Sequence, residues 1–339
     1  MRSASKRRRS SPRSPSRTRA SRAVAPPGRG GYAVWVRWWR SARNHERRVV
    51  AADRLRGCLL GGALADALAF AHEGRVPGPA PALRVGSISD DTQLTLATCE
   101  ALISAKGEVR PEVVAEHFVR WHRHHGFVGI GAATAKAVRE LSVGGHWALV
   151  GRKGEMAAGN GAAIRVAPLA FALDLSTRRG RQVLRDVSRI THHSDEAYVG
   201  ALAIALTIQE AAAGWSDRTA LFEHLAAELP DTAVRDRLVE VAEHEGVTIT
   251  DLAAQLGSSG YVVESVPLAI HAFCAEAEGS FIEMVTQIVE AGGDCDSIAS
   301  MAGQCFGALR GVEGLPNGLL TQLPSIIEEV SDQIGHRLA

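Results

Sequence analysis

The chain has little of what marks membrane proteins, disulfide-rich proteins or β-sheet proteins. No apolar run in its 339 residues reaches the ~18 residues that a membrane-spanning helix needs, so no membrane partner is expected. The five cysteines are scattered and none forms a CxxC pair, which favours reduced thiols in a cytoplasmic protein over a disulfide framework. Alternating β patterns extend over only a few residues. These absences favour a helical globular protein.

The net charge of +1 conceals an uneven distribution of charge along the chain. Residues 1–50 contain fourteen arginines and Lys6 but only one acidic residue, Glu46. The other residues carry 23 of the 38 basic side chains and 36 of the 37 acidic ones. The sequence therefore predicts a basic extension, residues 1–50, joined to an acidic body.

The extension is rich in Arg, Ser and Pro and cannot bury enough apolar surface to fold by itself. Its arginines would suit a tether to nucleic acid, because they neutralise phosphates. A transit peptide has a similar composition. A start codon upstream in an arginine-rich reading frame would also give such an extension, and the absence of a defined motif favours this last interpretation.

The body, residues 51–339, is predicted to be one all-α domain. Leu55, Leu59, Ala63 and Asp66 recur at the spacing of one helix face. Similar periodicity predicts helices near 94–105, 111–124, 131–141, 161–173, 195–213, 218–229, 231–244, 266–277, 280–291 and 296–309. No linker-like stretch divides these segments.

Two of the expected helices begin with more carboxylates than a helix N-terminus requires. Asp294 and Asp296 follow the glycine pair Gly292–Gly293, and Asp90 and Asp91 stand in the stretch SISDDTQ. One acid is enough to cap a helix, so each pair is either excess capping or part of a cation site shared by two helix ends. Oxygen ligands alone suit Mg²⁺, Mn²⁺ or Ca²⁺. Gly293 would allow a ligand to approach the backbone closely.

Two further acids, Asp66 and Glu73, are seven residues apart in an otherwise apolar segment. On one continuous helix this spacing places both on the same face. They would then either both face inward, or Asp66 would form buried hydrogen bonds while Glu73 lies at a solvated helix end.

Five motifs in fixed order make this body resemble the ADP-ribosylglycohydrolase family. They span about Leu55 to Pro316 and read RGCLLGGALADALAFAHE, ISDDTQLTL, AAGNGAAIRVAPLAF, RITHHSDEAYVGALAIAL and GGDCDSIASMAGQCFGALRG. The resemblance implies an all-α fold with two Mg²⁺ or Mn²⁺ ions at the mouth of a cleft. It implies metal ligands at Ser89, Asp90, Asp91, Asp294, Asp296 and Ser297.

The same resemblance implies how the rest of the site is composed. Asn160, Gly161, His192 and Tyr261 match ligand-contacting positions, and Glu73 matches a mobile acid near the metals. Gly129 stands where arginine-directed members often carry Asp. Gly129 and Gly131 would instead offer backbone N–H groups to a pyrophosphate.

The implied activity is hydrolysis of the bond between C1 of the distal ribose of ADP-ribose and an acceptor. Glu73 or Asp91 would act as general base. The substrate would be an ADP-ribosylated protein or another ADP-ribose conjugate. Its acceptor would be an arginine, a serine or another side chain, a nucleic acid or a small molecule. The alternative is a relative that binds ADP-ribose or serves a structural role without catalysis.

Overall fold

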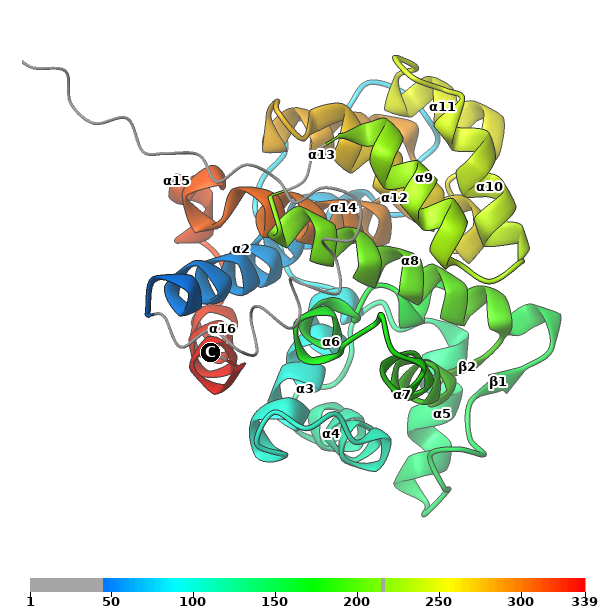
Figure 1. Ribbon diagram of the computed structural model, residues 1–339, viewed down its shortest axis with the longest axis vertical. Coiled ribbons are helices and arrows are strands. Elements are labelled where there is room, and N and C mark those ends of the chain that lie inside the picture. The colour runs from blue at the N-terminus through cyan, green and yellow to red at the C-terminus, as the bar shows by residue number, and fades with distance from the viewer. Residues whose placement is uncertain (1–44, 215–216, 339) are drawn as a thin grey trace, which may run out of the picture.

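The structure is a bundle of helices around a helical core, as the sequence predicts. The computed structural model describes residues 45–214 and 217–338 (Figure 1). Its α-helices are α2 (His45–Ala69), α3 (Asp90–Ser104), α4 (Pro111–His124), α5 (Ala132–Ser142), α6 (Ala167–Ala172), α7 (Arg178–Arg189), α8 (Asp195–Ala212), α9 (Arg218–Glu228), α10 (Ala233–Ala242), α11 (Ile249–Leu256), α12 (Val262–Glu276), α13 (Phe281–Ala291), α14 (Cys295–Arg310), α15 (Asn317–Leu320) and α16 (Ser325–Leu338).

Short 3₁₀ turns and one two-residue strand pair complete the fold. The turns are η1 (Phe70–His72), η2 (Glu155–Ala157), η3 (Asn160–Ala162) and η4 (Val312–Gly314). The strands β1 (Arg152–Lys153) and β2 (His192–His193) pair in parallel, with Arg152 opposite His192. None of the described helices combines the length and the apolar character that crossing a membrane requires.

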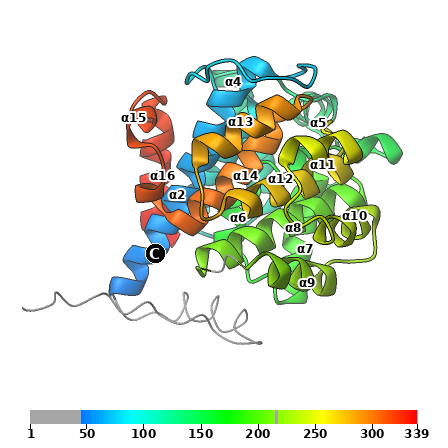
Figure 2. The same cartoon turned by 90° about the horizontal axis from the view of Figure 1, so that it is seen from above.

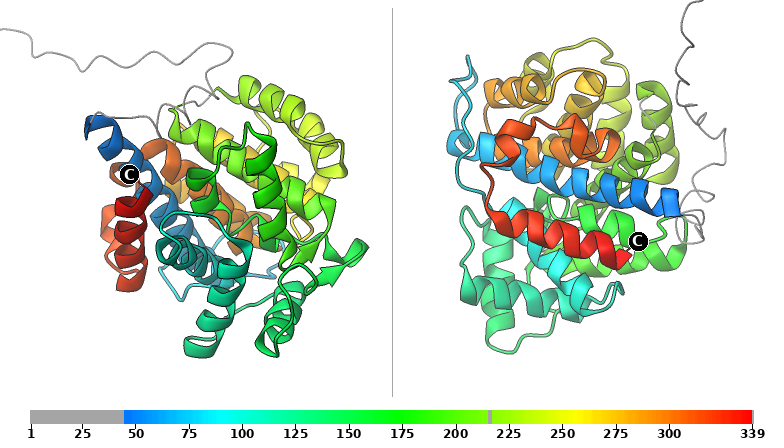
Figure 3. Two further views of the ribbon diagram at one scale, coloured as in Figure 1. Left: turned by 60° about the horizontal axis from the view of Figure 1, so that its bottom comes forward. Right: turned by 90° about the vertical axis from the view of Figure 1, so that its left-hand side faces the viewer.

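Helices α8, α12 and α14 form the centre of the bundle and are buried along most of their length. Helices α9, α10 and α11 lie on one side of this centre, and α15 and α16 lie on the other (Figure 2). Helix α16, at the end of the chain, runs beside α2 (Figure 3). One core therefore joins both ends of the described chain, which confirms the prediction of a single domain.

The first helix begins before the predicted domain boundary. Helix α2 starts at His45 and includes the last six residues of the extension predicted over residues 1–50. The rest of that extension lies outside the described residues, so the prediction of a nucleic-acid partner for it stays a prediction.

Helices α2 and α14 approach each other closely at a crossing where four glycines, Gly57, Gly61, Gly303 and Gly307, face one another. A Cβ on Gly61 would lie 2.4 Å from the carbonyl oxygen of Gly303, and one on Gly307 would lie 1.9 Å from that of Gly57. Backbone carbonyls cannot turn aside as a side chain can, so only glycine permits this separation. The crossing therefore fixes the position of α14 relative to α2.

The structure decides between the two alternatives for Asp66 and Glu73 and shows one expectation about helix continuity to be wrong. Helix α2 ends at Ala69, and Glu73 follows the η1 turn with extended backbone angles (φ −52°, ψ 137°), so Asp66 and Glu73 do not share one helix face. The helix expected over 161–173 is also interrupted. It consists of the η3 turn and the short helix α6, whose first turn contains Pro168. Proline lacks the N–H that a continuing helix would need, so a new helix begins there.

We expect Gly61→Ala to lower the free energy of unfolding by about 2–3 kcal/mol, because the new methyl group would meet a backbone carbonyl. Gly335→Ala is the matched control. Gly335 also lies within a helix, α16, but its Cβ would contact only the Ala52 methyl group at 3.9 Å. Alanine should stabilise that helix by up to about 1 kcal/mol. Denaturant unfolding of both variants measures the difference, and equal effects of the two substitutions would contradict the account of the crossing.

Candidate functional site

A cleft of about 460 Å³ gathers residues from seven separate segments of the chain. The N-termini of α3 and α14 and the turn after η1 contribute its carboxylates. The N-terminus of α5 with the preceding loop, the β1–η3 segment, β2 and the loop before α12 contribute its other walls. Twelve of the fourteen site residues expected from the sequence line this cleft: Glu73, Asp90, Asp91, Gly129, Gly131, Asn160, Gly161, His192, Gly293, Asp294, Asp296 and Ser297.

Asp66 holds the N-terminus of α3 in place from beneath the cleft. Its fully buried carboxylate accepts hydrogen bonds from the backbone N–H groups of Ser89, at 3.0 and 3.2 Å, and of Thr92, at 3.3 Å. It also accepts a bond from the Thr92 hydroxyl. This confirms Asp66 as a buried hydrogen-bonding residue that orients the two acids between Ser89 and Thr92.

The acids at the two helix starts are not needed as caps. Helix α3 is capped by Ser89, whose Oγ accepts the N–H of Asp91 at 3.2 Å. Asp294 stands at the cap position of α14 but makes no capping hydrogen bond with its side chain. Excess capping therefore does not account for these acids.

The backbone around Gly292 and Gly293 turns Asp294 into the cleft. Both glycines have positive φ, and a Cβ on Gly293 would lie 2.2 Å from the carbonyl oxygen of Ser258. The N–H of Asp294 donates to that same oxygen at 2.7 Å. Asn160 Nδ2 donates to Asp294 Oδ2, also at 2.7 Å. The Asp294 backbone is thus held by the Ser258 carbonyl, and its carboxylate by the Asn160 amide.

A direct contact joins the two helix N-termini. Ser297 Oγ of α14 donates to Asp91 Oδ1 of α3 at 3.3 Å. The other oxygen of that carboxylate, Asp91 Oδ2, and Asp296 Oδ1 are buried and have no hydrogen-bond partner among the described residues. Buried carboxylate oxygens without a donor are costly unless a cation satisfies them.

The electrostatics of the cluster fit the binding of a cation. Burial, followed by the charge of Asp294, raises the pKa of Asp296 to about 9. Burial, followed by the charge of Asp66, raises the pKa of Asp90 to about 7, and burial raises the pKa of Asp91 well above its usual value. Mutual repulsion of this kind is relieved by positive charge, and oxygen ligands suit Mg²⁺ or Mn²⁺.

Glu73 reaches the cluster from the turn after η1. Oxygens of Glu73, Asp294 and Asp296 all lie within 4.8 Å of one another. Reciprocal backbone bonds tie this turn to the α14 start, from Gly74 N–H to Gly293 O at 2.8 Å and from Gly293 N–H to Arg75 O at 3.0 Å. Glu73 is exposed, unlike the four aspartates. Burial of part of the carboxyl, and then the Asp294 charge, raise the pKa of Glu73.

The glycine-rich loop before α5 is attached to α3. Asp90 N–H donates to Val128 O at 2.7 Å, and Val128 N–H donates to Gln93 Oε1 at 2.9 Å. Gly129 has a φ of +82°, and a Cβ there would lie 3.4 Å from Asp90 Oδ1. An aspartate at this position would therefore be strained and would lie close to another carboxylate.

His192 lies against the Asn160–Gly161 turn. A Cβ on Gly161 would lie 2.7 Å from His192 Cε1, so glycine is required for the ring to lie where it does. His192 is 4% exposed, and burial lowers its pKa to about 3. The imidazole is therefore neutral at physiological pH and acts as a hydrogen-bonding group and not as a charge.

Two expected site residues lie outside the cleft lining. Ser89 is fully buried, and its Oγ is engaged in capping α3. Tyr261 is 43% exposed at the start of α12, and its backbone pairs with Gly159. The resemblance assigned Ser89 as a metal ligand and Tyr261 as a cleft-wall residue. Both assignments stay predictions.

Sequence reasoning missed Arg152 and Met156, which also line the cleft. Apart from His192, Arg152 is the only basic side chain among the described residues of the lining. It reaches the cleft because β1 pairs with β2, a contact between segments about forty residues apart that no local pattern signals.

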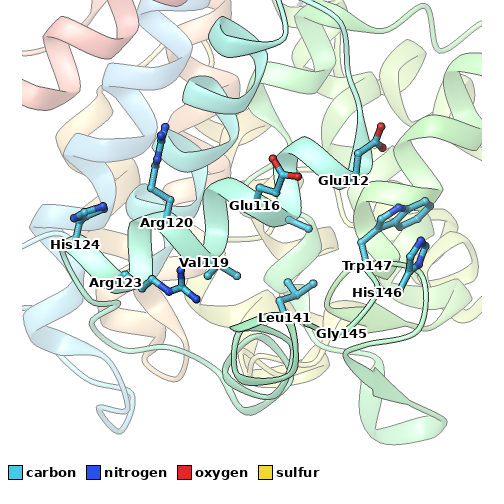
Figure 4. Close-up of a pocket in the computed structure, with 11 residues that line it drawn as sticks. Glu112, Glu116, Val119, Arg120, Arg123, His124, Leu141, Gly145, His146 and Trp147 are labelled. Atoms are coloured by element: carbon cyan, nitrogen blue, oxygen red, sulfur yellow. The ribbon is translucent and has the colours of Figure 1, made fainter. Parts of the chain in front are cut away.

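A larger concavity, of about 810 Å³, lies elsewhere, between α4 and the turn after α5. Figure 4 shows its lining, in which Glu112 and Glu116 lie along α4 and Trp147 lies beside His146. Arg120, Arg123 and His124 line its other end (Figure 4). Acids and bases are mixed here, and no group of three metal-ligating side chains occurs here among the described residues. The carboxylate cleft remains the candidate site.

Comparison with known proteins agrees with this geometry. A sequence model of the ADP-ribosylglycohydrolase family matches residues 47–339. This chain belongs to the ADP-ribosylglycohydrolase family. Relatives in this family are named as ADP-ribosylarginine hydrolase and ADP-ribosyl-[dinitrogen reductase] glycohydrolase, so this chain is an enzyme of the glycohydrolase family, which disfavours the non-catalytic alternative.

Two relatives and one solved structure can be aligned with most of the domain. An ADP-ribosylarginine hydrolase, Tri1, of Pseudomonas putida is 30% identical over 83% of this chain and 76% of its own length. The ADP-ribosyl-[dinitrogen reductase] glycohydrolase of Rhodospirillum rubrum is 27% identical over 85% of this chain and 96% of its own. A solved structure named as an ADP-ribosylglycohydrolase-related protein complex matches with a TM-score of 0.68 at 26% identity, covering 85% of this chain and 99% of that one.

The cluster of buried acids in the cleft predicts that Asp296→Asn changes the thermal stability in opposite directions with and without divalent cations. In EDTA at neutral pH, Asp296→Asn should raise the melting temperature by about 2 °C or more, because the raised pKa of Asp296 means that its carboxyl must take up a proton on folding, a cost that asparagine does not have. With Mg²⁺ or Mn²⁺ at one hundred times its Kd, the unsubstituted protein should gain about 2.7 kcal/mol of stability, and the variant should lose most of that gain.

Asp231→Asn is the control, since the Asp231 side chain is 94% exposed and far from the cleft along the chain. It should leave the response to cations unchanged. Thermal unfolding of the three proteins in EDTA, Mg²⁺ and Mn²⁺ makes the comparison. An Asp296→Asn variant that is stabilised by cations as strongly as the unsubstituted protein would rule out a metal site here.

Proposed function

We propose that this protein is a metal-dependent hydrolase that removes ADP-ribose from a modified acceptor, cleaving the glycosidic bond at C1 of the distal ribose. The observation that carries the proposal is the meeting of two helix N-termini. They bring four aspartates into one cleft without using them as caps, and Glu73 joins them. The two relatives described above are named as hydrolases that act on ADP-ribosyl groups.

The cleft contains two chemically different sets of groups, which suit the distal ribose and the diphosphate of ADP-ribose. The carboxylate set would hold two Mg²⁺ or Mn²⁺ ions through Asp90, Asp91, Asp294, Asp296 and the Ser297 hydroxyl. The buried Ser89, outside the lining, is the further ligand that the resemblance implies. When bound, such ions supply positive charge that offsets these carboxylates and attracts oxygens of the distal ribose and of water.

The second set of groups consists of hydrogen-bond donors and one cation. Gly129 and Gly131 offer backbone N–H groups and Arg152 offers a positive charge, which suit the negative charge of a diphosphate. Asn160, Gly161 and His192 line the same cleft, and His192 lies on the strand that pairs with that of Arg152. In this arrangement the diphosphate would contact these donors, and C1 of the distal ribose would lie beside the carboxylates.

Glu73 is the residue that we assign as general base. Its carboxylate is exposed to water yet lies beside Asp294 and Asp296, and its pKa is raised above the usual value. A raised pKa makes a carboxylate a better proton acceptor. Glu73 accepts a proton as the water oxygen bonds to C1. The bond from C1 to the acceptor breaks, with its electron pair leaving on the acceptor, through a transition state of oxocarbenium character. Asp91 is less suited to this role because it is buried and bonded to Ser297.

Glu73→Gln tests the assignment, since glutamine keeps the shape of the side chain but cannot accept the proton. We expect kcat to fall by about 10²–10⁴-fold while the affinity for ADP-ribose changes by less than about threefold. Glu155→Gln is the control, because Glu155 is an exposed acid in the η2 turn that does not line the cleft. Steady-state release of ADP-ribose and calorimetric binding measure the two quantities. Parallel losses of turnover and affinity in Glu73→Gln would count against its role as base.

A further inference from the structure

A buried arginine, Arg165, lies directly behind the wall of the cleft that His192 forms. It is 1% exposed and makes no ion pair with a carboxylate among the described residues. Its guanidinium donates to the carbonyl oxygen of Gly161, to Val187 O at 3.4 Å and to the Thr191 hydroxyl at 2.8 Å. It also lies 5.1 Å from the centroid of the Phe118 ring. The only charge that offsets its burial is that of Asp90, which makes no ion pair with it, and all its hydrogen-bond partners are neutral. A buried charge in such surroundings is costly, so its contacts are expected to serve a specific arrangement.

The hydrogen bond from Arg165 makes the Thr191 hydroxyl oxygen an acceptor and so limits where its hydrogen can be donated. Thr191 is fully buried, and its Oγ1 has two neighbours within hydrogen-bond distance in the described part of the chain, Arg165 Nη2 and His192 Nδ1 at 2.7 Å. A guanidinium can only donate, so Thr191 Oγ1 accepts from Arg165. The single hydroxyl hydrogen would be left without an acceptor in the interior unless it is donated to His192 Nδ1.

This chain of hydrogen bonds, from Arg165 to Thr191 to His192, determines which imidazole nitrogen carries the proton. If Nδ1 accepts from Thr191, the hydrogen of the neutral ring lies on Nε2. Nε2 faces the Gly159–Gly161 turn, where a Cβ on Gly159 would lie 3.2 Å from it. No hydrogen bond from Nε2 to a described residue competes with a ligand in the cleft. The ring is therefore ready to donate to an oxygen atom of a bound molecule.

We propose that Arg165 and Thr191 are positioning residues that fix His192 as the Nε2–H tautomer, so that the cleft offers a preformed donor to a ribose or phosphate oxygen. The identity of that ligand rests on the proposed function, whereas the tautomer does not. The β1–β2 pairing supports the arrangement, because Arg152 N–H donates to Thr191 O at 2.9 Å and holds the threonine backbone.

The tautomer can be measured directly from the ¹⁵N chemical shifts of the His192 ring in the ligand-free protein. In the unsubstituted protein, and in Thr191→Ser, which keeps the hydroxyl, we expect protonated Nε2 and unprotonated Nδ1. Thr191→Val has the same shape but no hydroxyl, so the ring should lose its fixed tautomer and show averaged shifts. Thr207→Val is the matched control. Thr207 is also fully buried, but it donates within its own helix, to Ala203 O at 2.8 Å, and this variant should leave His192 unchanged.

Binding of ADP-ribose gives the second readout. Calorimetry should show affinity about tenfold weaker for Thr191→Val, near that of the unsubstituted protein for Thr191→Ser, and unchanged for Thr207→Val. A hydrogen on Nδ1 in the unsubstituted protein, or identical ring shifts in Thr191→Val, would overturn the proposal. A fixed Nε2–H tautomer in a protein that does not bind ADP-ribose would support the positioning role and count against the proposed function alone.

Discussion

The glycine-lined crossing of α2 and α14 is the constraint on which the rest of the site depends. Because Gly57 and Gly61 meet Gly303 and Gly307 backbone to backbone, the two helices approach more closely than side chains would allow. Helix α2 carries the Asp66 carboxylate that organises the start of α3, and α14 begins with the second pair of acids. One helix contact thereby sets the separation of two helix N-termini that lie about two hundred residues apart in the sequence.

The site that results is electrostatically unfavourable in the absence of cations. Asp91 and Asp296 each have a buried oxygen that finds no hydrogen-bond partner in the described part of the chain, and burial followed by the charges of neighbouring acids raises the pKa of both carboxyls. The rigid scaffold tolerates this because the carboxylates lie on helix ends that are fixed by packing elsewhere. Functional sites are often preorganised in this way: they hold mutually unfavourable groups in place, and the protein is less stable than the same fold would be without them.

The sequence predicted the parts of this site that are local. The acids at both helix starts, the Asn160–Gly161 turn and His192 occur in short motifs, and the structure brings them into one cleft. Helix α7 was missed because its twelve residues include five arginines and bury few apolar side chains. Arg152 and Arg165 were missed for another reason. Their roles arise from contacts with β2 and Thr191 across the fold, which helical periodicity does not encode.

The central claim is that divalent cations and the two helix N-termini act together to release ADP-ribose. It is tested most directly by incubating the full chain with ADP-ribosyl-arginine, ADP-ribosyl-serine and O-acetyl-ADP-ribose in Mg²⁺, Mn²⁺ or EDTA, beside a variant with Asp294→Ala and Asp296→Ala. The account predicts release of ADP-ribose from at least one substrate, with loss in EDTA and in the double variant. Release that continues undiminished in EDTA, or in the double variant, would contradict it.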